Sequence, residues 1–145
     1  MDSFTSAQKL FLAGYNCSQS VFAANAPRLG IDEKTALRIA EGLGGGVGRM
    51  REVCGAFSAC AMLAGLAKDA DALPDRERRK AVYEFVQNLS RDFVRANGSI
   101  ICREILDLQK GAPTPPSPDE RTARYYAERP CLRVVGNADA IARMI

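Results

Sequence analysis

The sequence predicts an all-α protein, a single-domain bundle of about six to eight helices with a proline-rich loop before the C-terminal helices. Apolar residues recur at intervals of three and four through most of the chain, as along one face of a helix, and no segment shows a convincing strand pattern. Glycines and prolines separate these segments. With 145 residues, 47% of them apolar, the chain has the size of one domain with its own core. We therefore expect residues 1–145 to form one helical domain.

Polar caps and helix-ending residues delimit three expected helices in the N-terminal third. Each helix follows a residue whose side chain can accept a hydrogen bond from a first-turn amide, and each ends near a glycine or proline. The expected caps are Ser3 or Thr5, then Asn16, then Asp32, and the expected stops are Gly14, Pro27 or Gly30, and Gly42. Cys17 therefore falls in the first turn of the second helix.

A glycine-rich run at residues 44–48 leads into a helix of small residues that begins near Cys54. Because the run follows a helix and lacks the Lys-Ser/Thr ending of a phosphate-binding loop, we interpret it as a turn that lets two helices approach closely and leaves room near Cys54. Arg49 and Arg51 stand just ahead of Cys54, where first-turn amides and positive charge would stabilise a thiolate. Cys60, among apolar neighbours in the middle of this helix, is expected to be an inert core thiol.

The C-terminal half is expected to hold a long helix and three shorter ones. Apolar spacing predicts the long helix from Leu73 and Pro74 to Gly98, and Ser99 is the expected cap of a short helix over residues 100–108. A stiff proline-rich connector follows at residues 112–118. One further helix is expected at residues 119–128. Pro130 suits the first position of the last helix, which starts with Cys131.

Four of the five cysteines share one kind of position. The caps place each of them in the first turn of a separate helix, where the pKa of a thiol can fall from about 8.5 to roughly 3.5–7.5. They are Cys17, Cys54, Cys102 and Cys131. The alternative is that a helix start simply tolerates a small and often buried residue. We favour the functional interpretation, because a chance explanation needs four independent placements.

Composition excludes several classes of function. A net charge of +3 with scattered arginines gives no sign of a nucleic-acid partner, and no apolar stretch is long enough for a membrane span. The N-terminus lacks the pattern of a signal peptide, so we expect a cytoplasmic protein. In a reducing compartment, five cysteines are not expected to form a static disulfide framework. The absence of histidine excludes a Cys-His catalytic pair and any histidine-bound metal.

The order and spacing of these motifs resemble one known family over nearly the whole chain. The motifs are Gly14-Tyr15-Asn16-Cys17-Ser18-Gln19-Ser20-Val21, Gly44-Gly45-Gly46-Val47-Gly48-Arg49-Met50 and Cys54-Gly55-Ala56, followed by Cys102 and Cys131. They are similar to the C_GCAxxG_C_C family, whose members are expected to be redox-active proteins. The resemblance implies a small all-α domain with Cys17, Cys54, Cys102 and Cys131 as signature cysteines. Ala59 stands where the family usually has glycine.

The first hypothesis is a redox protein that uses cysteine thiols for thiol/disulfide or electron-transfer chemistry with an unknown redox partner or small-molecule substrate. Cys54 is the expected attacking thiolate, its pKa lowered by Arg49 and Arg51, with Glu52 moving a proton and Gly55 as a further site residue. Because no Cys-x-x-Cys is present, the resolving cysteine must come from another helix. We expect Cys102 to pair with Cys131, since the proline connector between them can double back.

Two alternatives stay open at the level of sequence. Cys17, Cys54, Cys102 and Cys131 are a ligand set for zinc or an iron-sulfur cluster, although their spacings are long. The chain could instead be a structural or interaction domain, including a homo-oligomer, whose cysteines only pack. Arg121, Arg124 and Arg129 could meet an acidic partner, with nothing in the sequence to single one out.

Overall fold

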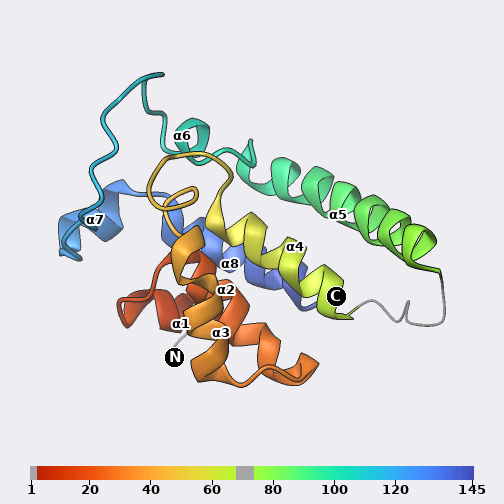
Figure 1. Cartoon of the computed structure of the whole chain (residues 1–145). Helices are drawn as coiled ribbons and strands as arrows, with labels where there is room; N and C mark the ends of the chain where they lie inside the picture. Colours follow the sequence, from red (N-terminus) through yellow and green to blue (C-terminus); the bar gives the residue numbers. More distant parts are fainter. Residues whose placement is uncertain (1–2, 68–73) are drawn as a thin grey trace.

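The computed structural model describes residues 3–67 and 74–145, and the regular secondary structure of these residues is helical (Figure 1). In chain order the helices are α1 (Ser6–Leu12), α2 (Cys17–Asn25), the 3-10 helix η1 (Ala26–Leu29), α3 (Glu33–Ala40), the 3-10 helix η2 (Glu41–Leu43), α4 (Gly55–Ala67), α5 (Asp75–Asn97), α6 (Cys102–Ile105), α7 (Ala123–Glu128) and α8 (Cys131–Ala142). The described part of the chain has no strand, only one isolated β-bridge. The predicted all-α fold is confirmed.

The predicted caps begin the N-terminal helices. The side chains of Thr5 and Asn16 accept hydrogen bonds from the amides three residues on, over 3.2 and 2.9 Å, and both complete capping boxes. Asp32 accepts one from the amide of Thr35 over 3.0 Å. These bonds satisfy amides that the helix itself leaves without partners. The start of α2, and with it Cys17, is therefore fixed by local chemistry.

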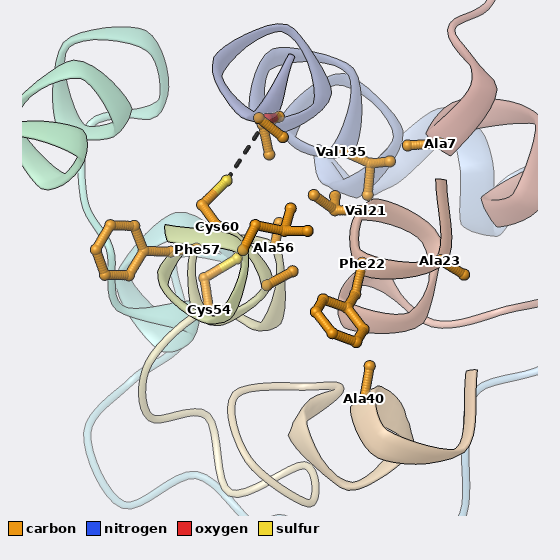
Figure 2. Close-up of a cluster of buried hydrophobic side chains, with 14 of the residues drawn as sticks. Ala7, Val21, Phe22, Ala23, Ala40, Cys54, Ala56, Phe57, Cys60 and Val135 are labelled. Atoms are coloured by element: carbon orange, nitrogen blue, oxygen red, sulfur yellow. Dashed lines mark hydrogen bonds between the residues drawn. The ribbon is translucent and has the colours of Figure 1, made fainter. Parts of the chain in front are cut away.

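Helix α2 lies at the centre of the bundle and packs against α1, α3, α4 and α8. Figure 2 shows side chains of α2 and α4 meeting in the core, with Val135 of α8 above them. On the far side of α4, Phe57 packs edge-on against Phe93 of α5, with ring centroids 5.5 Å apart. The long helix α5 thus joins the bundle through its C-terminal half, where Leu89 and Phe93 are its buried residues.

Cys60 is the core thiol that the sequence predicts. It is fully buried, and its Sγ donates a hydrogen bond to the carbonyl oxygen of Ala138 in α8 over 3.6 Å, drawn as a dashed line in Figure 2. Burial raises the pKa of Cys60 to about 12, with a smaller contribution from the charge of Asp139. A thiol held in its neutral form inside the core has no route to solvent chemistry.

The structure differs from the expected boundaries of two C-terminal elements. Helix α7 begins at Ala123 instead of residue 119, and Thr122 caps it, because the Asp119 carboxylate is bound by two arginines. Ser99 does not cap α6, because its Oγ accepts a hydrogen bond from the nearby amide of Ile101, and α6 spans only Cys102–Ile105. The expected helix start at Leu73 lies outside the described residues.

No helix in the described ranges has both the length and the apolar character needed to cross a membrane.

Candidate functional site

The four first-turn cysteines line one cavity of about 590 Å³. Cys17, Cys102 and Cys131 are the first residues of α2, α6 and α8, and Cys54 immediately precedes α4. The helix starts expected to hold cysteines therefore do hold them, and the fold brings these starts together. Local capping signals predict that each cysteine begins a helix, but the convergence comes from the packing of the helices.

The glycine-rich run adopts a left-handed coil beside α6 (Figure 1). Residues 45–49 all have φ between +56° and +75°, a region that is strained for residues with a side chain. The coil is closed by hydrogen bonds such as the one from the amide of Glu52 to the carbonyl of Gly46, over 2.8 Å. A Cβ on Gly46 would lie 2.6 Å from the Cβ of Cys102. The run is thus a close-approach turn as predicted, but the cysteine that it makes room for is Cys102 and not Cys54.

A short antiparallel bridge fixes the starts of α4 and α6 to each other. Val53 pairs with Ile101, the amide of Cys54 donates to the carbonyl of Ile100 over 2.7 Å, and the amide of Cys102 donates to the carbonyl of Glu52 over 2.6 Å. These bonds hold two of the four cysteines by their own backbones. Their side chains consequently enter the cavity from a rigid frame.

The Cys17 and Cys54 thiols interact, and this interaction shifts their pKa values in opposite directions. The Cys54 thiol lowers the pKa of Cys17 to about 6, opposed by burial and helped by the backbone amides of Gly45, Ser18 and Gly55. The same hydrogen bond, burial and the negative charge of Cys17 raise the pKa of Cys54 well above its ordinary value. Cys17 is therefore the thiolate of the pair at neutral pH, and Cys54 is its donor.

The prediction that Cys54 carries the lowered pKa is therefore wrong. It rested on the two arginines that precede Cys54 in the chain, but the left-handed backbone turns their side chains elsewhere. Arg51 Nη1 lies 3.7 Å from the Sγ of Cys102, and Arg49 forms an ion pair with Asp119 over 2.9 Å. The lowered pKa belongs to Cys17 instead, and its causes are the Cys54 thiol and the backbone amides of Gly45, Ser18 and Gly55, with no guanidinium among them.

Glu52 is also oriented differently from the expectation. Its carboxylate lies 3.6 Å from Arg103 and is 62% exposed, so it is not placed to move a proton at Cys54. Its backbone contributes instead, because the carbonyl of Glu52 holds the amide of Cys102. Gly55, in contrast, does stand at the site, since a Cβ there would lie 2.8 Å from the Sγ of Cys17.

Cys102 and Cys131 are weaker acids than Cys17. Burial raises the pKa of Cys102 and outweighs the opposing effect of Arg51. Burial likewise raises the pKa of Cys131 to about 12, with further contributions from the charges of Cys17 and Cys102. The cavity thus holds one acidic thiol and three thiols that stay protonated at neutral pH.

Four arginines and two carboxylates form the charged lining of the cavity. These are Arg49, Arg51, Arg121 and Arg129, with Glu41 and Asp119. Arg121 lies over the ring of Phe11, with its Cζ 4.2 Å from the centroid, and donates to the carbonyls of Phe11 and Tyr15. The sequence offers Arg121 and Arg129 as possible contacts for an acidic partner but gives neither of them a place in the fold. No signal in the sequence assigns one, because the proline connector carries them back to the cavity.

The described residues, which include all four lining cysteines, contain no group of three or more Cys, Asp or Glu side chains that could hold a metal ion. The predicted four-cysteine site for zinc or an iron-sulfur cluster stays a prediction from the sequence, and the arrangement of these thiols does not favour it for a single ion.

Fold and site together define an all-α cysteine protein, in which helix starts converge on a cavity with one acidic thiol. The chain belongs to the C_GCAxxG_C_C family, whose model matches residues 15–145 and is described as "Putative redox-active protein (C_GCAxxG_C_C)". Searches of the curated proteins and of the solved structures each found no significant match. The resemblance seen in the sequence is thereby confirmed at the level of the family.

Proposed function

We propose that this protein is a thiol/disulfide redox protein in which Cys17 is the attacking thiolate and Cys54 the resolving thiol. The observation that carries the proposal is the closeness of Cys17 to the Cys54 segment: a Cβ on Gly55, the residue after Cys54, would lie 2.8 Å from the Cys17 Sγ, and the Cys54 thiol lowers the pKa of Cys17 to about 6. A nucleophilic thiol is most effective when its pKa lies near the ambient pH, and its resolving partner must be close. Both conditions are met by this pair and by no other cysteine of the cavity.

The reaction consists of two exchanges at sulfur. The Cys17 thiolate attacks one sulfur of a substrate disulfide, forming a mixed disulfide and releasing the other half of the substrate as a thiolate. Cys54 then gives up its proton to that half and attacks the Cys17 sulfur. The Cys17–Cys54 disulfide forms, and the second half leaves as a thiolate. The substrate gains the two electrons that the protein loses, and an external dithiol returns them by the reverse steps.

The electrostatics of the pair support this order of events. The Cys54 thiol stabilises the Cys17 thiolate before attack, and its own pKa is raised by that hydrogen bond, by burial and by the negative charge of Cys17. Once Cys17 is in a mixed disulfide, that charge is gone, so Cys54 deprotonates more readily. The resolving thiol therefore becomes a better nucleophile only after the mixed disulfide has formed.

Cys102 and Cys131 complete the arrangement as the remaining pair. Of the three ways to pair four cysteines, only one contains Cys17–Cys54, and it joins Cys102 to Cys131, the pair predicted from the sequence. Their raised pKa values make them slower nucleophiles than Cys17. We propose that they form a second disulfide only under stronger oxidation. Free thiols of this kind suit the reducing cytoplasm expected from the sequence.

Trapping of the mixed disulfide tests the proposal. Protein with Cys54→Ser is treated with hydroxyethyl disulfide at neutral pH, and the modified cysteine is identified by peptide mass. The adduct is expected on Cys17 and to persist, because no resolving thiol remains. Wild-type protein treated in the same way should yield the Cys17–Cys54 disulfide and two equivalents of free mercaptoethanol.

Cys60→Ser is the matched control, since Cys60 lies in the same helix as the site but in the core. It should react as the wild type does. A lasting adduct on Cys102 or Cys131 with Cys17 unmodified, or wild-type protein that forms no internal disulfide, would contradict the proposal. Stoichiometric iron or zinc in protein purified without oxygen would favour the metal alternative instead.

A further inference from the structure

The cavity around the thiols carries an excess of positive charge. Four arginines line it against two carboxylates, and Asp119 is shared between Arg49 and Arg129, at 2.9 Å from each. Glu41 is exposed, and its carboxylate accepts a hydrogen bond from Gln19. The lining therefore attracts anions to the same space that holds the reactive thiol.

Arg51 is the least compensated of the four arginines. Its exposed fraction is 9%, and no carboxylate within the described ranges forms an ion pair with it. Its guanidinium has one side-chain partner, the Sγ of Cys102, at 3.7 Å, and that thiol is neutral at neutral pH because its pKa is raised. A buried guanidinium that has no carboxylate in an ion pair with it is costly, so a site that keeps one is suited to receive an anion.

The backbone shows that this placement of Arg51 is imposed by the fold. Arg51 has φ +62°, a left-handed conformation that costs free energy in a residue with a side chain. Its amide and its carbonyl are both held, the first by the carbonyl of Gly45 and the second by the amide of Arg103. The strained backbone turns the side chain away from Cys54 and into the cavity.

We propose that the cavity binds an anionic ligand, and that the substrate is a small disulfide bearing a carboxylate or a similar anionic group, which Arg51 recognises. This rests on the thiol/disulfide function proposed above and names its substrate class. The anionic group lies against the Arg51 guanidinium, beside Cys102, and the disulfide extends toward Cys17 on the opposite helix start. The exchange steps are those already described, with the anionic disulfide as the two-electron acceptor.

Two measurements on purified protein separate anion binding from redox chemistry. The first compares alkylation of Cys17 by iodoacetate, an anion, and by neutral iodoacetamide, followed by peptide mass; glutarate is added as an unreactive competitor. The second compares the rates of exchange with dithiodipropionate, hydroxyethyl disulfide and cystamine, which are anionic, neutral and cationic disulfides.

We expect different results from variants that remove or keep the charge of Arg51. Arg51→Gln should lower the rate ratio of iodoacetate to iodoacetamide at Cys17 by about tenfold, as expected for the loss of a charge-assisted hydrogen bond. It should also abolish protection by glutarate. Arg51→Lys should keep most of the preference, because it keeps the charge. Arg95→Gln, which removes an exposed arginine from α5, changes net charge equally and should have no effect.

The outcomes distinguish this inference from the proposed function. If no disulfide exchanges but alkylation still prefers the anion through Arg51, the anion site stands and the redox function falls. If all three disulfides exchange alike and Arg51→Gln leaves the alkylation ratio unchanged, the redox function stands and the anion site is overturned. Should Arg51→Gln fail to fold, the wild type decides alone, since the absence of both an anion preference and glutarate protection overturns the inference.

Discussion

Gly55 lies so close to Cys17 that a Cβ on the glycine would stand 2.8 Å from the Cys17 sulfur. The same Cβ would meet the backbone carbonyl oxygen of Leu43 at 2.7 Å, so moving Gly55 away from Cys17 would not make room for a side chain. The amide of Gly55 is also one of the groups that lower the pKa of Cys17. The residue after Cys54 therefore has to be glycine to leave space for the Cys17 thiol, which belongs to α2.

Replacing this glycine should damage the site more than the helix. Gly55→Ala forces Cys17 or the η2 backbone to move, so we expect the protein to lose about 1–3 kcal/mol of stability, as overpacking typically costs. Cys17 should also react more slowly with iodoacetamide at neutral pH. Gly65→Ala is the matched change at the other end of α4, where a Cβ meets nothing within 4 Å. It should stabilise the protein by roughly 0.5–1 kcal/mol.

Thermal or urea unfolding, together with the alkylation rate of Cys17, checks both variants. Equal stability changes for Gly55→Ala and Gly65→Ala would show that the close contact with Cys17 has no energetic weight.

The acidity of Cys17 predicts a particular pH profile. Because the thiolate is the reactive form, the rate of Cys17 alkylation should be close to its maximum at neutral pH. The rate should fall as the pH drops through about 6. Cys54→Ala removes the hydrogen bond that lowers this pKa most, so the midpoint should move upward toward the ordinary thiol value. Cys54→Ser keeps a hydroxyl donor and should retain much of the shift. The profile is measured by iodoacetamide labelling between acid and alkaline pH, with the Cys17 peptide quantified.

A profile whose midpoint stays the same in Cys54→Ala would assign the lowered pKa to the backbone amides alone. It would remove Cys54 as the partner that tunes Cys17.

Gly46 gives a third prediction, which concerns Cys102. Gly46→Ala and Gly48→Ala both put a side chain on a left-handed residue, at φ +75° and +56°. Only the first would bring a Cβ to 2.6 Å from the Cβ of Cys102, while the second has open space around it. Both variants should lose stability through backbone strain, by about 1–2 kcal/mol. Only Gly46→Ala should displace Cys102 and so prevent the Cys102–Cys131 disulfide under strong oxidation.

Peptide mapping of the oxidised variants provides the measurement. Formation of the Cys102–Cys131 disulfide to the same extent in both variants would contradict a role for Gly46 in placing Cys102.

Local chemistry made the helix starts predictable. The hydrogen bonds at Thr5, Asn16 and Asp32 involve residues three apart, so the pattern of side chains contains the whole interaction. For the same reason Cys17 could be placed at a helix start, whereas Cys131 could be placed at one because it follows Pro130, which has no side-chain cap hydrogen bond but suits the beginning of a helix. Cys60 could be placed in the core, because apolar neighbours surround it along the helix.

The order of thiol acidities was not predictable, because it depends on contacts between segments far apart in the chain. Neighbours in sequence suggested that Arg49 and Arg51 would serve Cys54. The left-handed backbone at both arginines sends one to Asp119 and the other to Cys102. The groups that lower the pKa of Cys17 come from three separate segments, which no local pattern brings together.

Asp119 shows the same limit at the proline connector. Its position after Pro118 suggested a helix start, but its carboxylate lies 2.9 Å from Arg49 and 2.9 Å from Arg129. Arg49 also donates to the carbonyl of Pro115. One arginine from the glycine-rich run thus holds the connector over the cavity at two points, and Pro116 and Pro118 become part of the cavity lining.

This attachment leads to the last prediction. Asp119→Asn removes the charge that joins Arg49 to Arg129 and should loosen the connector. Trypsin should then cleave after the exposed Lys110 a few times faster. This increase is the one expected for the loss of about 1 kcal/mol in partly exposed ion pairs. High salt should act on the wild type in the same direction, because it screens these charges. Asp92→Asn, which loses a pair with Arg95 on the surface of α5, is the control and should leave cleavage at Lys110 unchanged. Cleavage rates are followed by mass spectrometry of the first fragments. Equal rates in Asp119→Asn and the wild type would mean that the connector is held by the Pro115 contact and by packing, and not by the ion pairs of Asp119.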